Sequence, residues 1–159
     1  MGEVVAATHV RLFRLAARLL GSRADAEDAV QETYLRAFEA LRQGRYEEQS
    51  KLEPWLATIM TRYALDVARR RKVRAIDPAI DPNSLAWEGL SDDAHLALVA
   101  IARWLSGLPV DQRAAIVLKY WEGMSNAEVG RALGVSEGAV EQRLLRARGT
   151  LKKVMDDER

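Results

Sequence analysis

Residues 124–148 read MSNAEVGRALGVSEGAVEQRLLRAR, and this stretch constrains the fold more than any other part of the chain. Ser125, followed three residues later by Glu128, makes a capping box, which predicts that a helix begins there. Gly134 predicts the end of that helix and a tight turn, and Ser136 predicts the cap of a second helix. Two helices joined in this way are typical of a helix-turn-helix.

The second helix of this pair is expected to have one apolar and one polar face. Val140 and Leu144 lie four residues apart, which predicts that both face the core. The residues that can point outward are Glu137, Glu141, Gln142, Arg143 and Arg146. Arginine pairs well with guanine, glutamine with adenine, and glutamate accepts from cytosine, so this face suits a DNA major groove. A plain helical hairpin is the alternative interpretation.

Composition excludes several kinds of site. The 159-residue chain has no cysteine and only two histidines, His9 and His95, which stand far apart in the sequence. Disulfides and thiolate chemistry are therefore excluded, and we expect no metal site, no cofactor and no role for either histidine. No apolar run approaches the length of a membrane span, and the first residues lack the parts of a signal peptide, which predicts a cytoplasmic protein.

Almost every periodic segment predicts helix, because Ala, Leu, Arg and Glu are abundant and alternating β-branched runs are missing. We expect an all-α protein with helices over residues 4–20, 25–41, 54–71, 93–106, 110–122, 126–133 and 136–155. Asp25 is expected to cap the second helix. Two Asp-Pro pairs and a purely acidic charge balance mark a break after the third helix. The sequence thus predicts two small helical domains, residues 1–72 and 92–159, joined by a flexible acidic linker over residues 73–91.

The third predicted helix separates into two stripes when residues are placed at about 100° each. The stripe expected to face the core holds Leu56, Met60, Tyr63 and Val67. A second stripe, roughly a quarter-turn away, holds Trp55, Arg62, Asp66 and Arg69, with Arg70 at its edge. An aromatic ring followed by guanidinium groups suits partly melted DNA, because bases stack on the ring and cations meet phosphates. Alternatively, Trp55 covers the core and Arg62 pairs with Asp66.

The second predicted helix also has two contrasting faces. Its core stripe is expected to hold Val30, Tyr34, Ala37 and Leu41, and its opposite face holds Asp25, Asp28, Glu32, Leu35 and Glu39. Carboxylates around one exposed leucine suit a basic, partly apolar partner helix, although a solvated face with a stray leucine is the alternative. The sequence supplies no nucleophile, phosphate-binding glycine loop or metal set, so we expect no enzymatic activity.

Taken in this order, three segments resemble the extracytoplasmic-function (ECF) group of bacterial sigma factors, the small promoter-recognition subunits of RNA polymerase. The resembling segments are residues 23–41, 54–72 and 108–148. The resemblance implies a sigma factor that binds core RNA polymerase and directs promoter-specific initiation by recognising the −10 and −35 elements and melting the −10 duplex. It also implies an anti-sigma protein as a further partner.

The resemblance assigns roles to three sets of residues. Core-polymerase binding is implied for Asp25, Asp28, Gln31, Glu32 and Leu35. Recognition of the −10 element is implied for Trp55, Arg62, Tyr63, Asp66, Arg69 and Arg70, with the loop at residues 43–52 holding a flipped base. Recognition of the −35 element is implied for Ser136, Glu137, Gln142, Arg143 and Arg146.

Two other functions stay open at this point. A sigma-factor mimic would sequester an anti-sigma protein without reading DNA, but it would have no need of the basic residues on both predicted DNA faces. An ordinary helix-turn-helix repressor with a helical ligand domain would leave the acidic segment at residues 25–32 unexplained. Salt-dependent promoter binding distinguishes a sigma factor from the mimic, and the repressor predicts tight binding of duplex DNA without polymerase.

Overall fold

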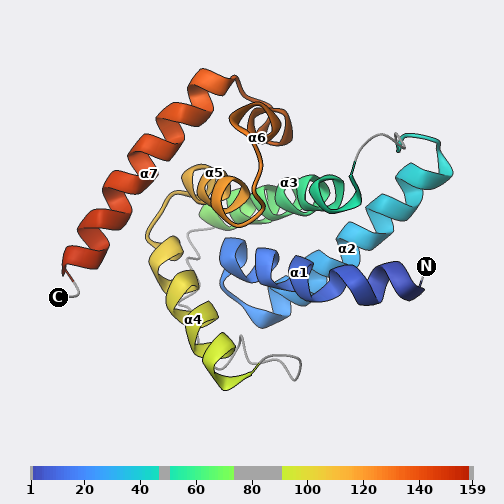
Figure 1. Cartoon of the computed structure of the whole chain (residues 1–159), viewed down its shortest axis with the longest axis horizontal. Helices are drawn as coiled ribbons and strands as arrows, with labels where there is room; N and C mark the ends of the chain where they lie inside the picture. The colour runs from blue at the N-terminus through green and yellow to red at the C-terminus, as the bar shows by residue number, and fades with distance from the viewer. Residues whose placement is uncertain (1, 47–50, 74–90, 158–159) are drawn as a thin grey trace.

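A computed structural model describes residues 2–46, 51–73 and 91–157, and in these ranges the chain is helical without any strand (Figure 1). The helices are α1 (Gly2–Leu20), α2 (Arg23–Arg42), α3 (Leu52–Val73), α4 (Asp92–Ser106), α5 (Val110–Tyr120), α6 (Asn126–Leu133) and α7 (Glu137–Asp157). The predicted all-α class is confirmed. Most of the predicted linker, and residues 47–50 of the predicted base-holding loop, lie outside the described residues.

The start of α2 differs from the sequence-based expectation. Ser22 has extended backbone angles, φ −137° and ψ 136°, and its side chain accepts a hydrogen bond from the backbone N–H of Asp25 at 3.4 Å. Ser22 is therefore the N-cap, and the prediction that Asp25 caps this helix is wrong. Asp25 lies in the first turn instead, where its negative charge favours the positive end of the helix dipole.

The inner face of α2 is made mainly of small residues. Ala37 and Ala40 are buried, at 5% and 9% exposure, whereas Leu41 is 44% exposed. The prediction that Leu41 belongs to the core is wrong, because Ala40, one position and about 100° earlier, faces inward in the last turn. Tyr34 is half-buried and packs against the core, and its hydroxyl lies 2.7 Å from the Thr8 hydroxyl of α1.

Helix α3 begins two residues before Pro54, so the proline lies in the first turn, where its missing N–H leaves no hydrogen bond unmade. Leu56 and Met60 are fully buried, as the periodicity predicts. Tyr63 and Val67 are half-buried and pack against the edge of the same core. The predicted core stripe of this helix is therefore confirmed at its centre and is shallower toward its carboxyl end.

The helix-turn-helix forms at the predicted positions. The Glu128 N–H donates to Ser125 Oγ at 3.2 Å, and the Ser125 N–H donates to Glu128 Oε1 at 3.4 Å, which completes the capping box. Gly134 ends α6 in the left-handed region, at φ 69° and ψ 34°, which glycine adopts without the steric penalty of a Cβ atom. Ser136 Oγ then accepts from the Ala139 N–H at 3.1 Å and caps α7.

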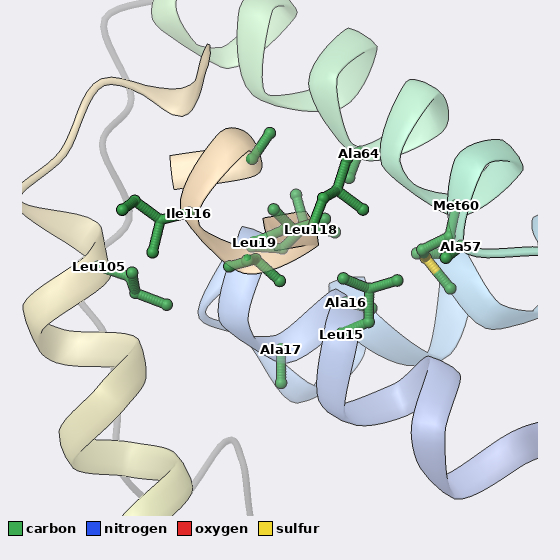
Figure 2. Close-up of a cluster of buried hydrophobic side chains, with 14 of the residues drawn as sticks. Leu15, Ala16, Ala17, Leu19, Ala57, Met60, Ala64, Leu105, Ile116 and Leu118 are labelled. Atoms are coloured by element: carbon green, nitrogen blue, oxygen red, sulfur yellow. The ribbon is translucent and has the colours of Figure 1, made fainter. Parts of the chain in front are cut away.

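Both predicted modules contribute to one continuous apolar core (Figure 2). In Figure 2, Leu105 of α4 lies at one edge of the cluster and Met60 of α3 at the other, with Leu15 and Leu19 of α1 and Leu118 of α5 between them. Figure 1 shows α3 running through the middle of the molecule, with α5 and α6 along one side and α1 along another. Because apolar burial is the main favourable term in folding, this shared core holds the two modules together. No helix in the described ranges has the length and apolar character needed to cross a membrane.

Candidate polymerase and nucleic-acid interfaces

The outer face of α2 carries most of the predicted polymerase-binding residues. Leu35 is 66% exposed, and Gln31 and Asp28 are exposed one and two turns earlier on the same side of the helix. Glu32 is half-buried and accepts a hydrogen bond from Arg36 Nε at 3.0 Å. These four predicted residues therefore form one surface with an apolar residue at its end.

Asp25 is placed differently from the other four. Its carboxylate forms an ion pair with Arg71 of α3, and its side chain is only 22% exposed. Since the partner lies on the neighbouring helix, Asp25 joins α2 to α3. Asp25 therefore holds α2 against α3 at the edge of the predicted surface, and the exposed part of that surface begins at Asp28.

Two large apolar residues on this side of α2 were not predicted from the sequence to be exposed. Phe38 is 52% exposed and Leu41 is 44% exposed. They follow Leu35 at intervals of three residues, so the exposed apolar surface continues toward the end of the helix. The spacing was available in the sequence, but Leu41 was assigned to the core and Phe38 to neither face.

Trp55 lies at the start of α3 and is half-buried. Its ring is tilted by 52° against the Tyr46 ring, with the two centroids 4.5 Å apart. Tyr46 comes from the loop predicted to hold a flipped base, and its aromatic side chain in that loop was the signal that sequence reasoning left unused. Further along α3, the Tyr63 ring contacts Arg36 of α2. The Cζ atom of Arg36 lies 5.1 Å from the ring centroid, which is a cation–π arrangement.

Arg62, the central cation of the predicted −10 stripe, contacts the helix-turn-helix. Its Nε donates to the backbone oxygen of Ala132 at 3.0 Å, and its terminal nitrogen donates to the backbone oxygen of Arg131 at 3.0 Å. The alternative expectation was that Arg62 pairs with Asp66. Within the described ranges the guanidinium of Arg62 instead donates to these two carbonyl oxygens.

The two accepting oxygens belong to the last turn of α6. Carbonyls in the last turn of a helix have no donor within the helix, and they form the negative end of its dipole. The oxygen of Gly130 receives the Val135 N–H at 2.9 Å, and Arg62 serves the next two. Arg62 therefore acts as a carboxyl-terminal cap that is supplied by the other module.

A second basic residue of the stripe is also engaged. The terminal nitrogen of Arg69 lies 3.0 Å from Asp111 Oδ1, in the first turn of α5. Both side chains are substantially exposed, at 54% and 41%, so the pair lies at the rim of the contact between α3 and α5. Asp66 and Arg70 are exposed beside it. The predicted −10 stripe thus faces the second module on one side and solvent on the other.

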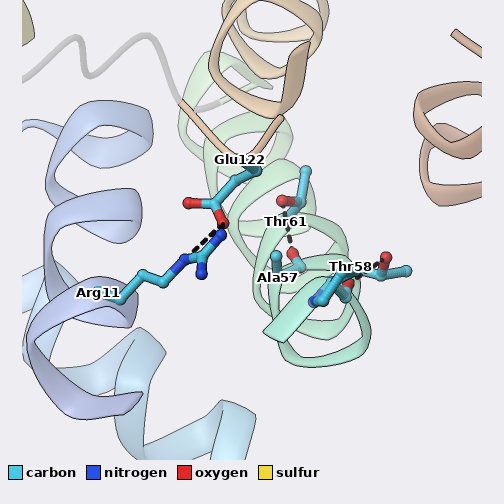
Figure 3. Close-up of polar contacts among 6 residues, drawn as sticks. Arg11, Ala57, Thr58, Thr61 and Glu122 are labelled. Carbon is cyan, nitrogen blue, oxygen red and sulfur yellow. Dashed lines mark hydrogen bonds and ion pairs between the residues drawn. The ribbon is translucent and has the colours of Figure 1, made fainter. Parts of the chain in front are cut away.

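An ion pair between a half-exposed arginine and a buried glutamate joins α1 to the segment after α5 (Figure 3). Arg11 reaches Glu122 Oε2 at 2.9 Å from its terminal nitrogen and at 3.0 Å from Nε, and the glutamate side chain is only 3% exposed. One and two turns along the same face of α1 lie Arg14 and Arg18, and Arg18 Cζ lies 5.1 Å from the Trp121 ring centroid. Burial lowers the pKa of Arg18 to about 10; Glu122 raises it and Arg14 lowers it further.

The predicted −35 face lies on α7, which forms an outer arm of the molecule (Figure 1). Glu137, Gln142 and Arg146 are exposed, and Arg143 is half-buried. Ser136 is exposed while its hydroxyl caps the helix. Val140 and Leu144, on the opposite side, are buried as predicted. Of the two predicted DNA surfaces, the one on α7 is open and the one on α3 is engaged by α5 and α6.

Known families match both modules. Residues 4–74 match the family described as Sigma-70 region 2, and residues 98–151 match the family described as Sigma-70, region 4. The ECF RNA polymerase sigma factor SigE of Mycolicibacterium smegmatis is 39% identical over 151 residues, with 89% of this chain and 56% of SigE covered. SigM of Mycobacterium tuberculosis is 35% identical over 147 residues, with 92% of this chain and 72% of SigM covered. The chain thus spans little more than half the length of SigE.

Solved structures give the same result. The sigma factor RpoE, in a complex with the anti-sigma factor NepR from Bartonella quintana, matches with a TM-score of 0.70 and 28% identity, over 99% of this chain and 98% of that chain. CnrH, in a complex with the cytosolic domain of CnrY, matches with a TM-score of 0.70 and 30% identity, over 99% and 88% of the two chains. The chain belongs to the ECF group of RNA polymerase sigma factors.

Proposed function

We propose that this protein binds core RNA polymerase and directs promoter-specific transcription initiation in the cytoplasm. Residues 1–72 serve the polymerase and the −10 element, residues 92–159 serve the −35 element, and residues 73–91 connect them. The observation that carries the proposal is the presence, in one chain, of an exposed acidic and apolar face on α2 and a helix-turn-helix whose α7 face is open. The catalytic chemistry belongs to the polymerase, so this chain supplies binding energy.

The α2 face is the proposed polymerase-binding site. Asp28, Gln31 and Glu32 offer acceptors to basic groups, and Leu35 offers an apolar anchor at the end of this surface. Interfaces of this kind combine a buried apolar contact with a polar rim, and charge complementarity increases the association rate. Asp25 contributes by holding α2 against α3 through Arg71.

The −10 element is proposed to bind along α3. Trp55 and Tyr63 present aromatic rings, and Arg62, Arg69 and Arg70 present cations for the phosphates, with Asp66 between them. Flipping a base out of the duplex costs a few kcal/mol, and stacking on an aromatic ring contributes about 1–3 kcal/mol per base. Capture of one or two bases therefore offsets the local melting.

The −35 element is proposed to receive the amino-terminal half of α7 in its major groove. Glu137, Gln142 and Arg146 are exposed and available for base edges, and we assign exposed Ser136 and half-buried Arg143 to contacts with the DNA backbone. The overall charge of the chain is only +1, so electrostatic attraction to DNA is modest and the polymerase is needed for tight binding.

A cytosolic anti-sigma protein is the further partner we propose, since the matched RpoE and CnrH structures are complexes with NepR and with the cytosolic domain of CnrY. A mimic that only sequesters such a protein is less well supported, because Arg143 and Arg146 remain available on α7.

Run-off transcription with purified core polymerase tests the proposal. Leu35→Glu should abolish polymerase binding and transcripts, whereas Leu96→Glu on α4 should not, although both leucines are 66% exposed. Failure of the unaltered chain to bind polymerase or to start transcription from any selected promoter would refute the proposed function.

A further inference from the structure

Gly138, in the first turn of α7, is a glycine for which the described part of the chain gives no internal reason. Its backbone is helical and it is exposed. A Cβ atom built there would meet only Ser136 Oγ, at 3.9 Å, which is ordinary van der Waals contact. The glycines at helix ends and turns differ, because four of them have positive φ, and Gly130 lies against backbone atoms.

Glycine at this position has a cost in helix stability. It destabilises a helix relative to alanine, because it loses more backbone freedom on folding. Within the described residues, no packing contact at Gly138 offsets this cost. A second use of glycine is to let another molecule come close to the backbone. The cause of glycine at position 138 is therefore to be sought in a molecule that binds to the outside of α7.

Gly138 lies on the side of α7 that points away from the core. Val140 and Leu144 are buried on the inner side. Gln142 follows Gly138 by four residues, so the two share one side of the helix, and both are exposed. Gln142 is also one of the residues to which the proposed function assigns a base edge. A molecule that Gln142 contacts would therefore lie next to the bare backbone of Gly138.

We propose that Gly138 is a positioning residue of the −35 site, where the lack of a side chain lets the first turn of α7 sit deeply enough in the major groove for Gln142 to reach a base. The inference rests on the proposed −35 function of α7 and deepens it. Direct hydrogen bonds to base edges span only about 2.7–3.2 Å, so a small outward shift of the helix breaks them. A methyl group at position 138 would cause such a shift and weaken a glutamine–adenine contact.

Gly149 provides a matched control in the same helix. It is exposed, and no atom lies within 4 Å of a Cβ atom built there. It lies on the same side of α7 as Gly138, but about 16 Å further along at 1.5 Å per residue, which exceeds the width of a major groove, about 12 Å. Alanine should therefore stabilise α7 at either position, but it should affect DNA binding only at position 138.

The test uses the full chain bound to core polymerase and a fluorescent duplex that carries the −35 element of a selected promoter, with a scrambled −35 duplex for comparison. The variants are Gly138→Ala, Gly149→Ala, Gln142→Ala and the double variant Gly138→Ala/Gln142→Ala. The last two complete a double-mutant cycle, which shows whether position 138 acts through Gln142. Urea denaturation verifies folding, and a single-stranded −10 oligonucleotide reports on the rest of the complex.

We expect Gly138→Ala to bind the −35 duplex about tenfold more weakly than the unaltered chain, which is the size of one lost bidentate base contact. Its urea midpoint should rise and its −10 binding should be unchanged, whereas Gly149→Ala should raise the midpoint and leave both DNA affinities unchanged. In the Gln142→Ala background, Gly138→Ala should cost less than about twofold. A structural defect in α7 would instead lower the midpoint and weaken binding in both backgrounds.

The inference and the proposed function fail in different ways. If the unaltered complex prefers the −35 duplex and Gly138→Ala binds it as tightly as Gly149→Ala, the role of Gly138 is overturned alone. A tenfold loss that persists in the Gln142→Ala background, or a lowered urea midpoint for Gly138→Ala, also overturns it. If the unaltered complex does not distinguish the −35 duplex from the scrambled one, the proposed −35 function falls, and this inference falls with it.

Discussion

Gly130 in α6 is the glycine of the helix-turn-helix at which an added methyl group should destabilise the fold most. A Cβ atom built there would lie 2.7 Å from the backbone oxygen of Val135 and 3.6 Å from Val140 Cγ2. The first distance is shorter than van der Waals contact allows, and the obstacle is backbone. The Val135 N–H is bonded to the Gly130 oxygen at 2.9 Å, so the turn cannot move away freely.

The size of the effect follows from two opposing contributions. Inserting a methyl group into a well-packed site costs about 1–3 kcal/mol, and replacing glycine by alanine within a helix returns up to about 1 kcal/mol. We therefore expect Gly130→Ala to lower the free energy of unfolding by about 1–2 kcal/mol. Gly149→Ala in α7 is the matched control, because no atom lies within 4 Å of its added Cβ, and it should gain about 0.5–1 kcal/mol.

Urea denaturation followed by circular dichroism measures both variants under one set of conditions. Because the two modules share a core, a single transition is expected, and the midpoints should separate in opposite directions from that of the unaltered chain. Binding of −35 duplex in complex with polymerase should weaken for Gly130→Ala only. If Gly130→Ala is as stable as Gly149→Ala, the close approach of α6 to the α6–α7 turn is not the reason for glycine at this position.

Three further outcomes are expected. Ser125→Ala removes the capping box and should lower the free energy of unfolding by about 1 kcal/mol in urea denaturation; an unchanged midpoint would contradict the capping role. Burial raises the pKa of Tyr34, which the hydrogen bond with Thr8 partly opposes, so the folded state holds this proton more tightly. The stabilisation is complete below the unfolded pKa of about 10 and is lost as pH rises through the folded pKa, so above about pH 10 the unaltered chain should lose more stability than Tyr34→Phe. Leu35→Glu should change the free energy of unfolding by less than about 0.5 kcal/mol, since Leu35 is 66% exposed, and a larger loss would mean that α2 packs differently.

Local sequence signals located the helix ends within the helix-turn-helix, where the physical cause is local. The capping box at Ser125 and the left-handed Gly134 depend on hydrogen bonds and sterics within a few residues, and both were found where predicted. The same kind of signal was misassigned at α2, where Ser22 and Asp25 are both acceptable caps and the backbone selected Ser22. Leu41 shows the limit of periodicity, because adjacent Ala40 and Leu41 cannot both face a helix neighbour in the last turn.

The division of α3 into a core stripe and a polar stripe came from the amino-acid sequence, because period and hydropathy are properties of the chain. The partners of the polar stripe came only from tertiary structure. Arg62 bonds a carbonyl 70 positions away, and Arg69 pairs with a carboxylate 42 positions away. A sequence pattern states which side of a helix is charged but not which distant element packs against it, since that depends on how both modules bury their shared apolar surface. For this protein, that packing brings the helix-turn-helix onto the cations expected to bind promoter DNA.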